Sequence, residues 1–599
     1  MEAYETLKYD VLIIGAGGAG LRAAISVCER GLRCGVVCKS LLGKAHTVMA
    51  EGGAAAALGN MGEKDSWEVH FRDTMVGGAS LNNPRIVEIF AHEAIDRVLE
   101  LEQYGAVFDR TPEGLISQRP FGGHTYRRLN HVGDRTGLEL IRTLQDKAVS
   151  LHPTFHMEVT ITSLLRDGQR VIGAYGYDRI SGKPIVFQAR AVVLATGGWG
   201  RMYRYTSNSW ESTGDGAAMA LEAGAELIDM EMVQFHPTGM LWPPSMRGIL
   251  VTEAVRGEGG VLRNASGDRF MYTPEYTPER YRGKFAESTE EAERWLDDKS
   301  ANRRPPELLP RDEVSRAIYK EVKAGRATEH GGVHLDVSHR GAAYVKRKLP
   351  AMYDQFLHLG GVDITREPME VYPTVHYTMG GIRVDPETCA STMPGLFAAG
   401  ECAAGLHGAN RLGGNSLTDI LVFGKRAGDG AAAFAEATDH GVVDPDQIAR
   451  EEATLNAPLG RPAAETPATI GAELQEAMQT DAMIERTEVC LSRCLDRIHE
   501  LQQRCDQIGV EGGRTYNPAW HAARDLRFQL RLSEVIVRSA ILRKESRGAH
   551  WRTDYPNMDP DWGRRNVVAR MVNSVVDVDT TPLPEMPEHL RLVMNEGAK

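Results

Sequence analysis

The chain has 599 residues, enough for roughly two to four packing units. Apolar residues make up 42% and charged residues 25%, as in globular proteins, and a net charge of −12 excludes a general nucleic-acid binder, because phosphates attract the opposite charge. No apolar run approaches the roughly 20 residues of a membrane span, and the polar, acidic first ten residues are unlike a secretion signal. The eight cysteines lack C-x-x-C or iron–sulfur spacing, so we expect reduced, cytosolic thiols and no metal or cluster held by this chain.

Short apolar strands followed directly by glycine mark the predicted organisation. They lie at residues 10–14, 191–195 and 395–399. The first leads through a glycine-rich turn into a helix at 21–29 and a strand at 32–37, which is an opening β–α–β unit. We expect the three strands to converge on one bound cofactor from distant parts of the chain.

The rest of the chain divides by composition. The stretch at about 235–372 reads as an inserted domain, and it contains a charged helix with a capping box formed by Ser288 and Glu291. The Pro- and Ala-rich segment 456–469 predicts a linker. Residues 470–550 have a helical pattern, and 551–599 are Pro-rich and predicted to be irregular.

The glycine-rich turn, Gly15-Ala-Gly17-Gly-Ala-Gly20, fits the pattern of a dinucleotide-binding turn. Gly15 permits the turn, Gly17 lets the backbone approach a pyrophosphate, and Gly20 lets the helix pack on the strand. The alternative is a plain glycine turn. The second strand ends in Cys38-Lys39-Ser40, where such sites carry an acid for the ribose, so the ribose must be bound by another group or the ligand is not NAD.

Further motifs follow in chain order, each combining histidine, arginine or acidic residues with glycine. They are Lys44-Ala-His46-Thr-Val-Met-Ala-Glu51-Gly52-Gly53, Gln234-Phe-His236-Pro-Thr-Gly239, Thr252-Glu253-Ala-Val-Arg256-Gly, Pro310-Arg311-Asp312, His376-Tyr-Thr-Met-Gly-Gly381 and His407-Gly-Ala-Asn-Arg411-Leu-Gly-Gly-Asn-Ser416-Leu417. Together they closely resemble the flavoprotein subunit of succinate dehydrogenase and fumarate reductase. The resemblance covers almost the whole chain, including Glu545-Ser-Arg547-Gly-Ala-His550.

The resemblance implies an α/β fold: a Rossmann-like FAD-binding domain with an inserted capping domain, followed by a helical domain and a C-terminal tail. The expected divisions are 1–234 and 373–440 for the two parts of the FAD-binding domain, 235–372 for the capping and substrate domain, 441–550 for the helical domain and 551–599 for the tail.

The resemblance also implies covalent FAD, bonded through His46. Glu401, after the third strand, matches the carboxylate that binds a ribose hydroxyl and would replace the acid missing near Ser40. The residues that match cofactor contacts are Gly15, Gly17, Gly18, Gly20, Lys39, Ser40, His46, Thr47, Glu51, Gly52, Gly53, Asp215, Glu401, Asn415, Ser416 and Leu417.

For the substrate, a dicarboxylate, the resemblance assigns donors to both ends. The matching residues are Phe121, an aromatic neighbour, His236 and Thr252 for one carboxylate, and His376 and Arg411 for the other. Arg311 matches the proton donor and acceptor, with Glu253 and Arg256 as its relay. Arginine is an unusual acid–base group, because its pKa is above about 12, and the alternative is a structural ion pair of Arg311 with Asp312 or Glu253.

The predicted partners follow from the electron path. FAD takes two electrons, and this chain lacks cluster ligands. The family pairs this flavoprotein with an iron–sulfur protein subunit, and also with a membrane anchor that carries the quinone site. We therefore expect a peripheral location on the cytoplasmic side of the inner membrane. A helix predicted at 521–552 carries eight Lys and Arg residues against three acids. We interpret it as a solvated face, with contact to the partner or to the covalent-flavin assembly machinery as the alternative.

The predicted activity is succinate dehydrogenase, with quinol:fumarate reductase as the alternative. Some fumarate reductases carry Glu at the position of Glu51, where some succinate dehydrogenases carry Gln, and a charge near the flavin would favour fumarate reduction. The quinone and the partner's clusters dominate the direction, however. A soluble L-aspartate oxidase or free-standing fumarate reductase is disfavoured by His46, and an FAD-bearing RNA-binding or scaffold protein by the intact substrate motifs and the acidic chain.

Overall fold

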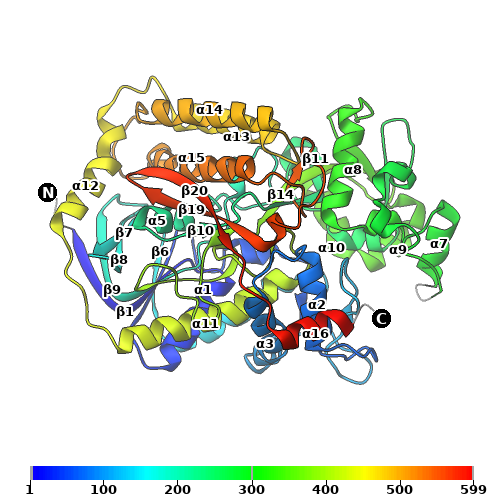
Figure 1. Ribbon diagram of the computed structural model, residues 1–599, viewed down its shortest axis with the longest axis horizontal. Helices are drawn as coiled ribbons and strands as arrows, with labels where there is room; N and C mark the ends of the chain where they lie inside the picture. The colour runs from blue at the N-terminus through cyan, green and yellow to red at the C-terminus, as the bar shows by residue number, and fades with distance from the viewer. Residues whose placement is uncertain (1–3, 299–300, 597–599) are drawn as a thin grey trace.

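The computed structural model describes residues 4–298 and 301–596 (Figure 1). Its largest sheet is built around β1 (Glu5–Ile14), which pairs in parallel with β2 (Cys34–Cys38) on one side and β9 (Pro184–Leu194) on the other. Strand β16 (Leu396–Ala398) pairs in parallel with the end of β9. The three predicted strands therefore lie in one sheet, which confirms that distant parts of the chain converge there.

Both faces of this sheet are covered, by α1 (Gly18–Glu29) and α11 (Asn415–Glu436) on one side of β1 and by residues of β7 (Val159–Asp167) and β8 (Arg170–Asp178) in the buried cluster on the other, which explains why Val11 to Ile14 are all apolar. Leu12 and Ile14 belong to one buried cluster and Val11 and Ile13 to another, as expected for side chains that alternate across a strand. The order of the sheet is β6-β2-β1-β9-β8-β7 in the described residues. Its remaining strand is β6 (Thr154–Met157), and the other helices of this part of the chain are α2 (Trp67–Gly77), α3 (Pro84–Gln103), α4 (Thr136–Ser150) and α5 (Asp215–Ala223).

A separate sheet, with the order β11-β14-β13-β12, carries the inserted segment. Its strands are β11 (Val233–Trp242), β12 (Val261–Arg263), β13 (Val333–Asp336) and β14 (Met369–Thr378). The helices are α6 (Glu253–Gly257), α7 (Thr289–Asp297), α8 (Arg311–Lys323), α9 (Ala342–Lys348) and α10 (Pro350–Gly360), of which α7 to α10 are labelled at the right of Figure 1. Both expected limits of the insertion fall within the antiparallel pair β11–β14, so paired strands connect it to the rest of the chain. Ser288 caps α7 by accepting a hydrogen bond from the Glu291 amide, as predicted.

The segment after residue 441 forms a layer of helices along one side of the molecule (Figure 1). These are α12 (Pro445–Asn456), α13 (Pro467–Asp481), α14 (Glu488–Cys505) and α15 (Pro518–Leu542). Helix α15 ends ten residues before the predicted 552. Of the eight basic residues at 521–552, Arg527, Arg531, Arg538 and Lys544 are partly exposed or exposed, but Arg524, Arg543, Arg547 and Arg552 are buried, which contradicts the solvated face for half of them. Arg543, for example, pairs with the carboxylates of Asp229, Glu231 and Glu545, so these charges are neutralised inside the protein.

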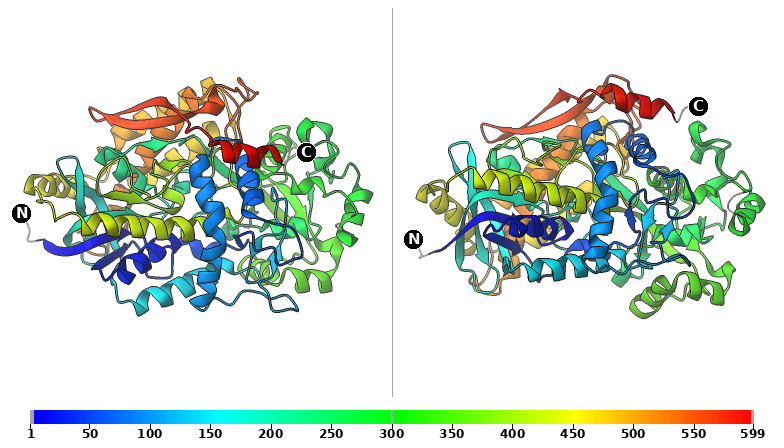
Figure 2. Two further views of the ribbon diagram at one scale, coloured as in Figure 1. Left: turned by 60° about the horizontal axis from the view of Figure 1, so that its bottom comes forward. Right: turned by 90° about the horizontal axis from the view of Figure 1, so that it is seen from below.

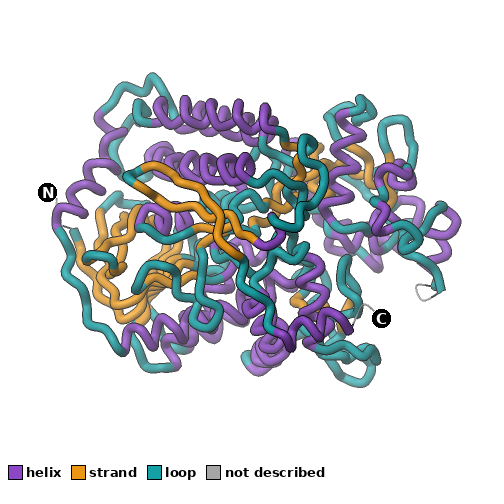
Figure 3. The backbone as a smooth tube through the Cα atoms, in the orientation of Figure 1, coloured by secondary structure: helices purple, strands orange, loops and turns teal. Residues whose placement is uncertain are grey.

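The prediction that residues 551–599 are irregular was wrong. Strands β19 (Arg565–Val572) and β20 (Val575–Pro582) form a hairpin that packs on α15, shown in orange in Figure 3. The turn between them is Asn573-Ser574, both with positive φ, which suits a two-residue hairpin turn. Strand β19 also pairs with β10 (Leu227–Ile228), and β10 pairs with β15 (Gly381–Ile382). Helix α16 (Glu588–Glu596) returns to contact α2 (Figure 2).

Candidate active site

The glycine turn after β1 is shaped by close backbone contacts. A Cβ on Gly15, which has φ +112°, would lie 2.1 Å from the Ala195 carbonyl oxygen, and one on Gly20 would lie 1.8 Å from that of Gly15. Gly17 precedes α1, and a Cβ there would make only ordinary contacts, with Ala45 and Thr47 at 3.5 Å, so the N-terminus of the helix is not crowded at this point. This is the arrangement in which backbone N–H groups approach a pyrophosphate.

The turn opens into a large cavity that also reaches the inserted segment. Most of the residues expected from the sequence line it: Gly15, Gly17, Gly18, Lys39, Ser40, His46, Thr47, Glu51, Gly52, Gly53, Phe121, Asp215, His236, Thr252, Glu253, Arg311, His376, Glu401, Arg411, Ser416 and Leu417. Three expected residues do not line it. Gly20 packs α1 on the sheet, Asn415 bonds to His70 and Thr74, and Arg256 lies behind Glu253.

Several buried polar atoms of the cavity lack a hydrogen-bond partner within the described residues. They are Oε2 of Glu51, Oγ1 of Thr196, Oγ of Ser209, Oε1 of Glu211, Nε2 of His236 and Nε of Arg411. Leaving a buried polar group unpaired costs about 1–3 kcal/mol, so such a set is normally completed by a ligand or water. The hydroxyls and carboxylate oxygens fit the polar groups of FAD beside the glycine turn, and the Arg411 and His236 nitrogens fit an anion.

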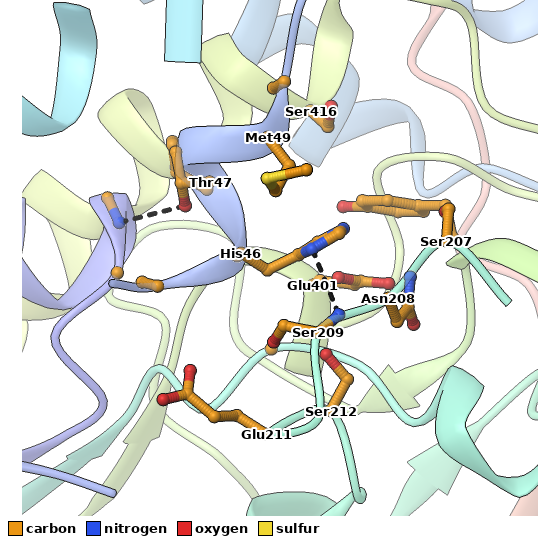
Figure 4. A pocket seen from close by; sticks show the side chains of 18 of the residues that line it. His46, Thr47, Met49, Ser207, Asn208, Ser209, Glu211, Ser212, Glu401 and Ser416 are labelled. Carbon is orange, nitrogen blue, oxygen red and sulfur yellow. Dashed lines mark hydrogen bonds between the residues drawn. The ribbon is translucent and has the colours of Figure 1, made fainter. Parts of the chain in front are cut away.

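His46 begins a short 3₁₀ turn (His46–Met49) and points across the cavity toward Ser209 (Figure 4). The Ser209 amide donates to its Nδ1 at 3.4 Å. Desolvation, with the nearby Arg411 charge, lowers the pKa of His46 to about 4, so the ring is neutral at physiological pH. Thr47 accepts a hydrogen bond from the Gly18 amide, which ties this turn to the start of α1.

Of two acidic residues expected at the cofactor, Glu401 has a raised pKa and Asp215 is ion-paired. Desolvation raises the pKa of Glu401 to about 7, although its carboxylate accepts a hydrogen bond from the Thr378 amide at 3.0 Å. Asp215 pairs with Lys39 at 3.0 Å, and Lys39 also reaches Asp525 of α15 at 2.8 Å. The C-terminal helical layer therefore contributes a charge directly behind the cavity.

The opposite end of the cavity brings two arginines together. Arg311 is the first residue of α8, and Arg411 lies in the loop before α11. Both donate to Oε1 of Gln234, at 3.2 and 3.1 Å. Arg411 also donates to Ser416 at 2.7 Å. Desolvation, reinforced by the Arg311 charge, lowers the pKa of Arg411 to about 9, so an anion bound here would be strongly favoured.

A chain of charged groups leads away from Arg311. Its Nε lies 3.5 Å from Glu253, and Glu253 lies 3.8 Å from Arg256. Arg256 is fully buried and donates to the Glu307 carbonyl. Burial lowers the pKa of both arginines. The sequence left Asp312 and Glu253 as possible ion-pair partners of Arg311. The structure pairs Arg311 with Glu253, whereas Asp312 accepts a hydrogen bond from Asn410.

The remaining expected substrate residues surround the two arginines. His236 and His376 meet edge to face with ring centroids 5.4 Å apart, and burial lowers the pKa of both well below 6.5. Ser207 bonds to Nδ1 of His376 at 2.9 Å. Phe121 packs so closely on the following loop that a Cβ on Gly413 would lie 2.2 Å from its ring. The site is therefore a buried pocket with neutral imidazoles and two guanidinium groups.

Sequence reasoning missed two features of this site. Gln234 joins the two arginines, and the signal available was its place two residues before His236 in the same motif. The loop Ser207–Ser212 lines one wall of the cavity beside His46 and Glu401 (Figure 4). Its run of Ser, Asn and Glu after a glycine-terminated strand was the signal for a ligand-binding loop.

Comparisons with known proteins agree with this geometry. Residues 10–417 match a model described as FAD binding domain, and residues 471–589 match one described as Fumarate reductase flavoprotein C-term. The chain is 38% identical to "Fumarate reductase flavoprotein subunit" of Mycobacterium tuberculosis, over 93% of this chain and 94% of the relative. It is also 38% identical to "Succinate dehydrogenase flavoprotein subunit" of Rickettsia bellii, over 93% and 92%. A structure described as Mycobacterium smegmatis Sdh1 in complex with UQ1 superposes with a TM-score of 0.86 at 53% identity, over 97% and 95%.

Proposed function

Because this chain belongs to the family of succinate dehydrogenase and fumarate reductase flavoprotein subunits, and is an FAD-dependent oxidoreductase, we propose that it oxidises succinate to fumarate. The observation that carries the proposal is the pair of buried nitrogens, Nε of Arg411 and Nε2 of His236, that lack a partner among the described residues. They line the same cavity as Arg311 and His376. A dianion with a carboxylate at each end would satisfy them.

In this proposal the protein residues hold the substrate and move a proton. FAD supplies hydride transfer when bound. Arg411 and His376 bind one carboxylate, and His236 and Thr252 bind the other, so the substrate is fixed near its reacting geometry. Arg311 accepts the proton released at the neighbouring carbon, because burial lowers its pKa, and it passes that proton on to Glu253 at 3.5 Å. Arg256 extends this path beyond Glu253.

We extend the proposal to covalent attachment of FAD through His46. The Ser209 amide occupies Nδ1, which leaves Nε2 as the ring nitrogen available for a bond to the cofactor. The low pKa of His46 supports this role, because an unprotonated ring can act as a nucleophile.

The direction we propose is succinate oxidation, and the state of Glu51 supports it. Desolvation, with a contribution from Asp134, raises the pKa of Glu51 to about 8, so this carboxyl is mostly neutral at pH 7. The negative charge that would favour fumarate reduction is then largely removed. Fumarate reduction with a quinol is the second candidate, favoured by the names of several relatives.

We propose that electrons leave through an iron–sulfur protein subunit to a membrane anchor with a quinone site. The relatives named as subunits of such complexes, and the Sdh1 structure described with UQ1, support this assignment. None of the helices in the described residues is long and apolar enough to cross a bilayer. In this proposal the chain is a peripheral subunit on the cytoplasmic side of the inner membrane.

The test is turnover by the purified complex with both dicarboxylates. We expect dye-linked succinate oxidation, inhibited competitively by malonate, and a cyclic voltammogram with a larger oxidative than reductive catalytic current. A larger current with fumarate would assign the second candidate instead, and no current with either substrate would reject both.

A further inference from the structure

The mouth of the cavity carries an exposed cation that the reaction itself does not use. Arg247 lies in the loop between β11 and α6, and it is solvent-exposed while it also lines the cavity. No carboxylate lies within ion-pair distance of it in the part of the chain that the structure describes. An arginine that meets both solvent and the cavity, and has no acidic partner, is available to a passing anion.

The position of Arg247 is fixed by an aromatic platform. Its guanidinium lies 5.8 Å from the centre of the Tyr205 ring, within the range of a cation–π contact. The ring itself packs edge to face on Tyr372, with centroids 5.5 Å apart. The following residue, Gly248, lies so close to the Thr206 carbonyl that a Cβ there would be 2.2 Å away. The loop is therefore held against the 205–206 backbone.

The contact between Gly248 and Thr206 places the loop that carries Arg247 close to the substrate residues. Ser207, next to Thr206, bonds to Nδ1 of His376 at 2.9 Å. Ile249 and Leu250, the next residues of the loop, line the cavity between Arg247 and Thr252. A path thus runs from an exposed guanidinium, along an apolar wall, to the buried donors.

The charge of the whole chain makes such a cation useful. With a net charge of −12, the protein repels a dicarboxylate at long range. Arg201 also lines the cavity and is only partly exposed, with desolvation alone lowering its pKa. Arg311 and Arg411 are buried, so they do little to attract a dicarboxylate that is still outside the cavity. Positive groups at the mouth would therefore offset the long-range repulsion of this substrate by the protein.

We propose that Arg247 forms a capture site for the dicarboxylate at the mouth of the cavity, which binds the incoming dianion transiently before it reaches the buried arginines. The ligand class is a small dicarboxylate, so the inference rests on the proposed function. Arg247 acts on arrival of the substrate and not on the chemical step.

Arg204 provides a matched control. It is also exposed and also lies over the Tyr205 ring, at 5.6 Å, but it is paired with Glu476 at 3.0 Å and does not line the cavity. Substitution of either arginine by Gln removes one positive charge and one contact with the same ring. A difference between the two variants therefore reports the position of the charge.

The test is the ionic-strength dependence of kcat/KM for succinate in the assembled, FAD-loaded enzyme. We expect Arg247→Gln to lower kcat/KM by roughly 3–10-fold at about 10 mM salt, with kcat unchanged, and to converge with wild type near 0.5 M salt, where the Debye length is only a few Å. Arg247→Glu should lower it further, Arg247→Lys should retain it, and Arg204→Gln should match wild type.

Two results would overturn the inference. One is an Arg247→Gln variant that behaves like Arg204→Gln at low salt. The other is a loss that persists at high salt and is not restored by Lys, which would make Arg247 a direct contact of the bound substrate. Failure of the proposed function is separate, because wild-type enzyme would then turn over neither succinate nor fumarate.

Discussion

Replacement of Arg311 by Lys should separate the proton transfer proposed for this residue from substrate binding. In the structure Arg311 makes two contacts from one planar group, Nε to Glu253 at 3.5 Å and a terminal nitrogen to Gln234 at 3.2 Å. A lysine ammonium is a compact point charge on a flexible stem and cannot reproduce this fork. The variant keeps the positive charge beside the substrate but loses the aligned link to Glu253.

The expected magnitude follows from that loss. A missing general acid–base group lowers turnover by about 10²–10⁴-fold, which corresponds to about 3–5 kcal/mol in the barrier. Malonate affinity should change by less than about threefold, because Arg411 and the local positive charge remain. Dye-linked succinate oxidation and malonate inhibition measure the two effects in the same preparation.

Arg316 provides the control for Arg311→Lys. It lies on the same helix, is partly buried, and lies 3.7 Å from Asp312, but it does not line the cavity. Arg316→Lys should retain turnover within a few-fold. If Arg311→Lys instead shows near-normal turnover with weak malonate binding, Arg311 is an anchor and proton transfer belongs to another group, with His376 the first alternative.

Three further substitutions test the cofactor and substrate residues. His46→Ala should bind FAD without a covalent bond, so the denatured protein should lose its in-gel flavin fluorescence. Succinate oxidation should fall more than fumarate reduction. Fluorescence that survives denaturation of the variant would reject His46 as the covalent link. Arg411→Ala should weaken malonate binding by about one to two decades, because a charge-assisted pair of roughly 1.5–3 kcal/mol is lost, and an unchanged inhibition constant would contradict this. Glu51→Gln should remove a pH dependence of stability: the folded pKa of about 8 exceeds the unfolded value of about 4.5, so wild type should lose stability relative to the variant between about pH 5 and 8, by up to a few kcal/mol. Parallel melting curves of the two apoproteins would show no divergence if Glu51 were ionised throughout.

The sequence predicted the sheet and most of the cavity because their signals are local or carried by motifs. An apolar strand ending in glycine is recognisable wherever it stands, and the order of the motifs identified the family. The burial of Arg524, Arg543, Arg547 and Arg552 was not predictable in this way. Two carboxylates that pair with Arg543, those of Asp229 and Glu231, lie more than 300 residues earlier in the chain, so a run of basic residues looked like a solvated surface.

The tail shows the same limit for secondary structure. Its prolines suggested irregular backbone, yet the hairpin β19–β20 lies between them, with Pro582 only at its end. Val567, Val568 and Ala569 are buried because β19 completes a sheet begun by β10, which lies more than 300 residues earlier. A pairing of that separation has no local sequence signal, whereas the Asn573-Ser574 turn did have one.

The position of Gln234 connects the fold to the chemistry. It lies at the start of β11, where the chain enters the inserted segment, and it accepts from Arg311 of that segment and from Arg411 of the FAD-binding part. Strand β14, which carries His376, pairs with β11 as the chain returns. The donors for a bound dianion therefore come from both sides of one strand pair, and a single amide oxygen fixes the spacing of the two guanidinium groups. In the proposed function, Arg311 transfers the proton and Arg411 binds a carboxylate, so the proposed chemistry depends on how the inserted segment is joined to the FAD-binding part.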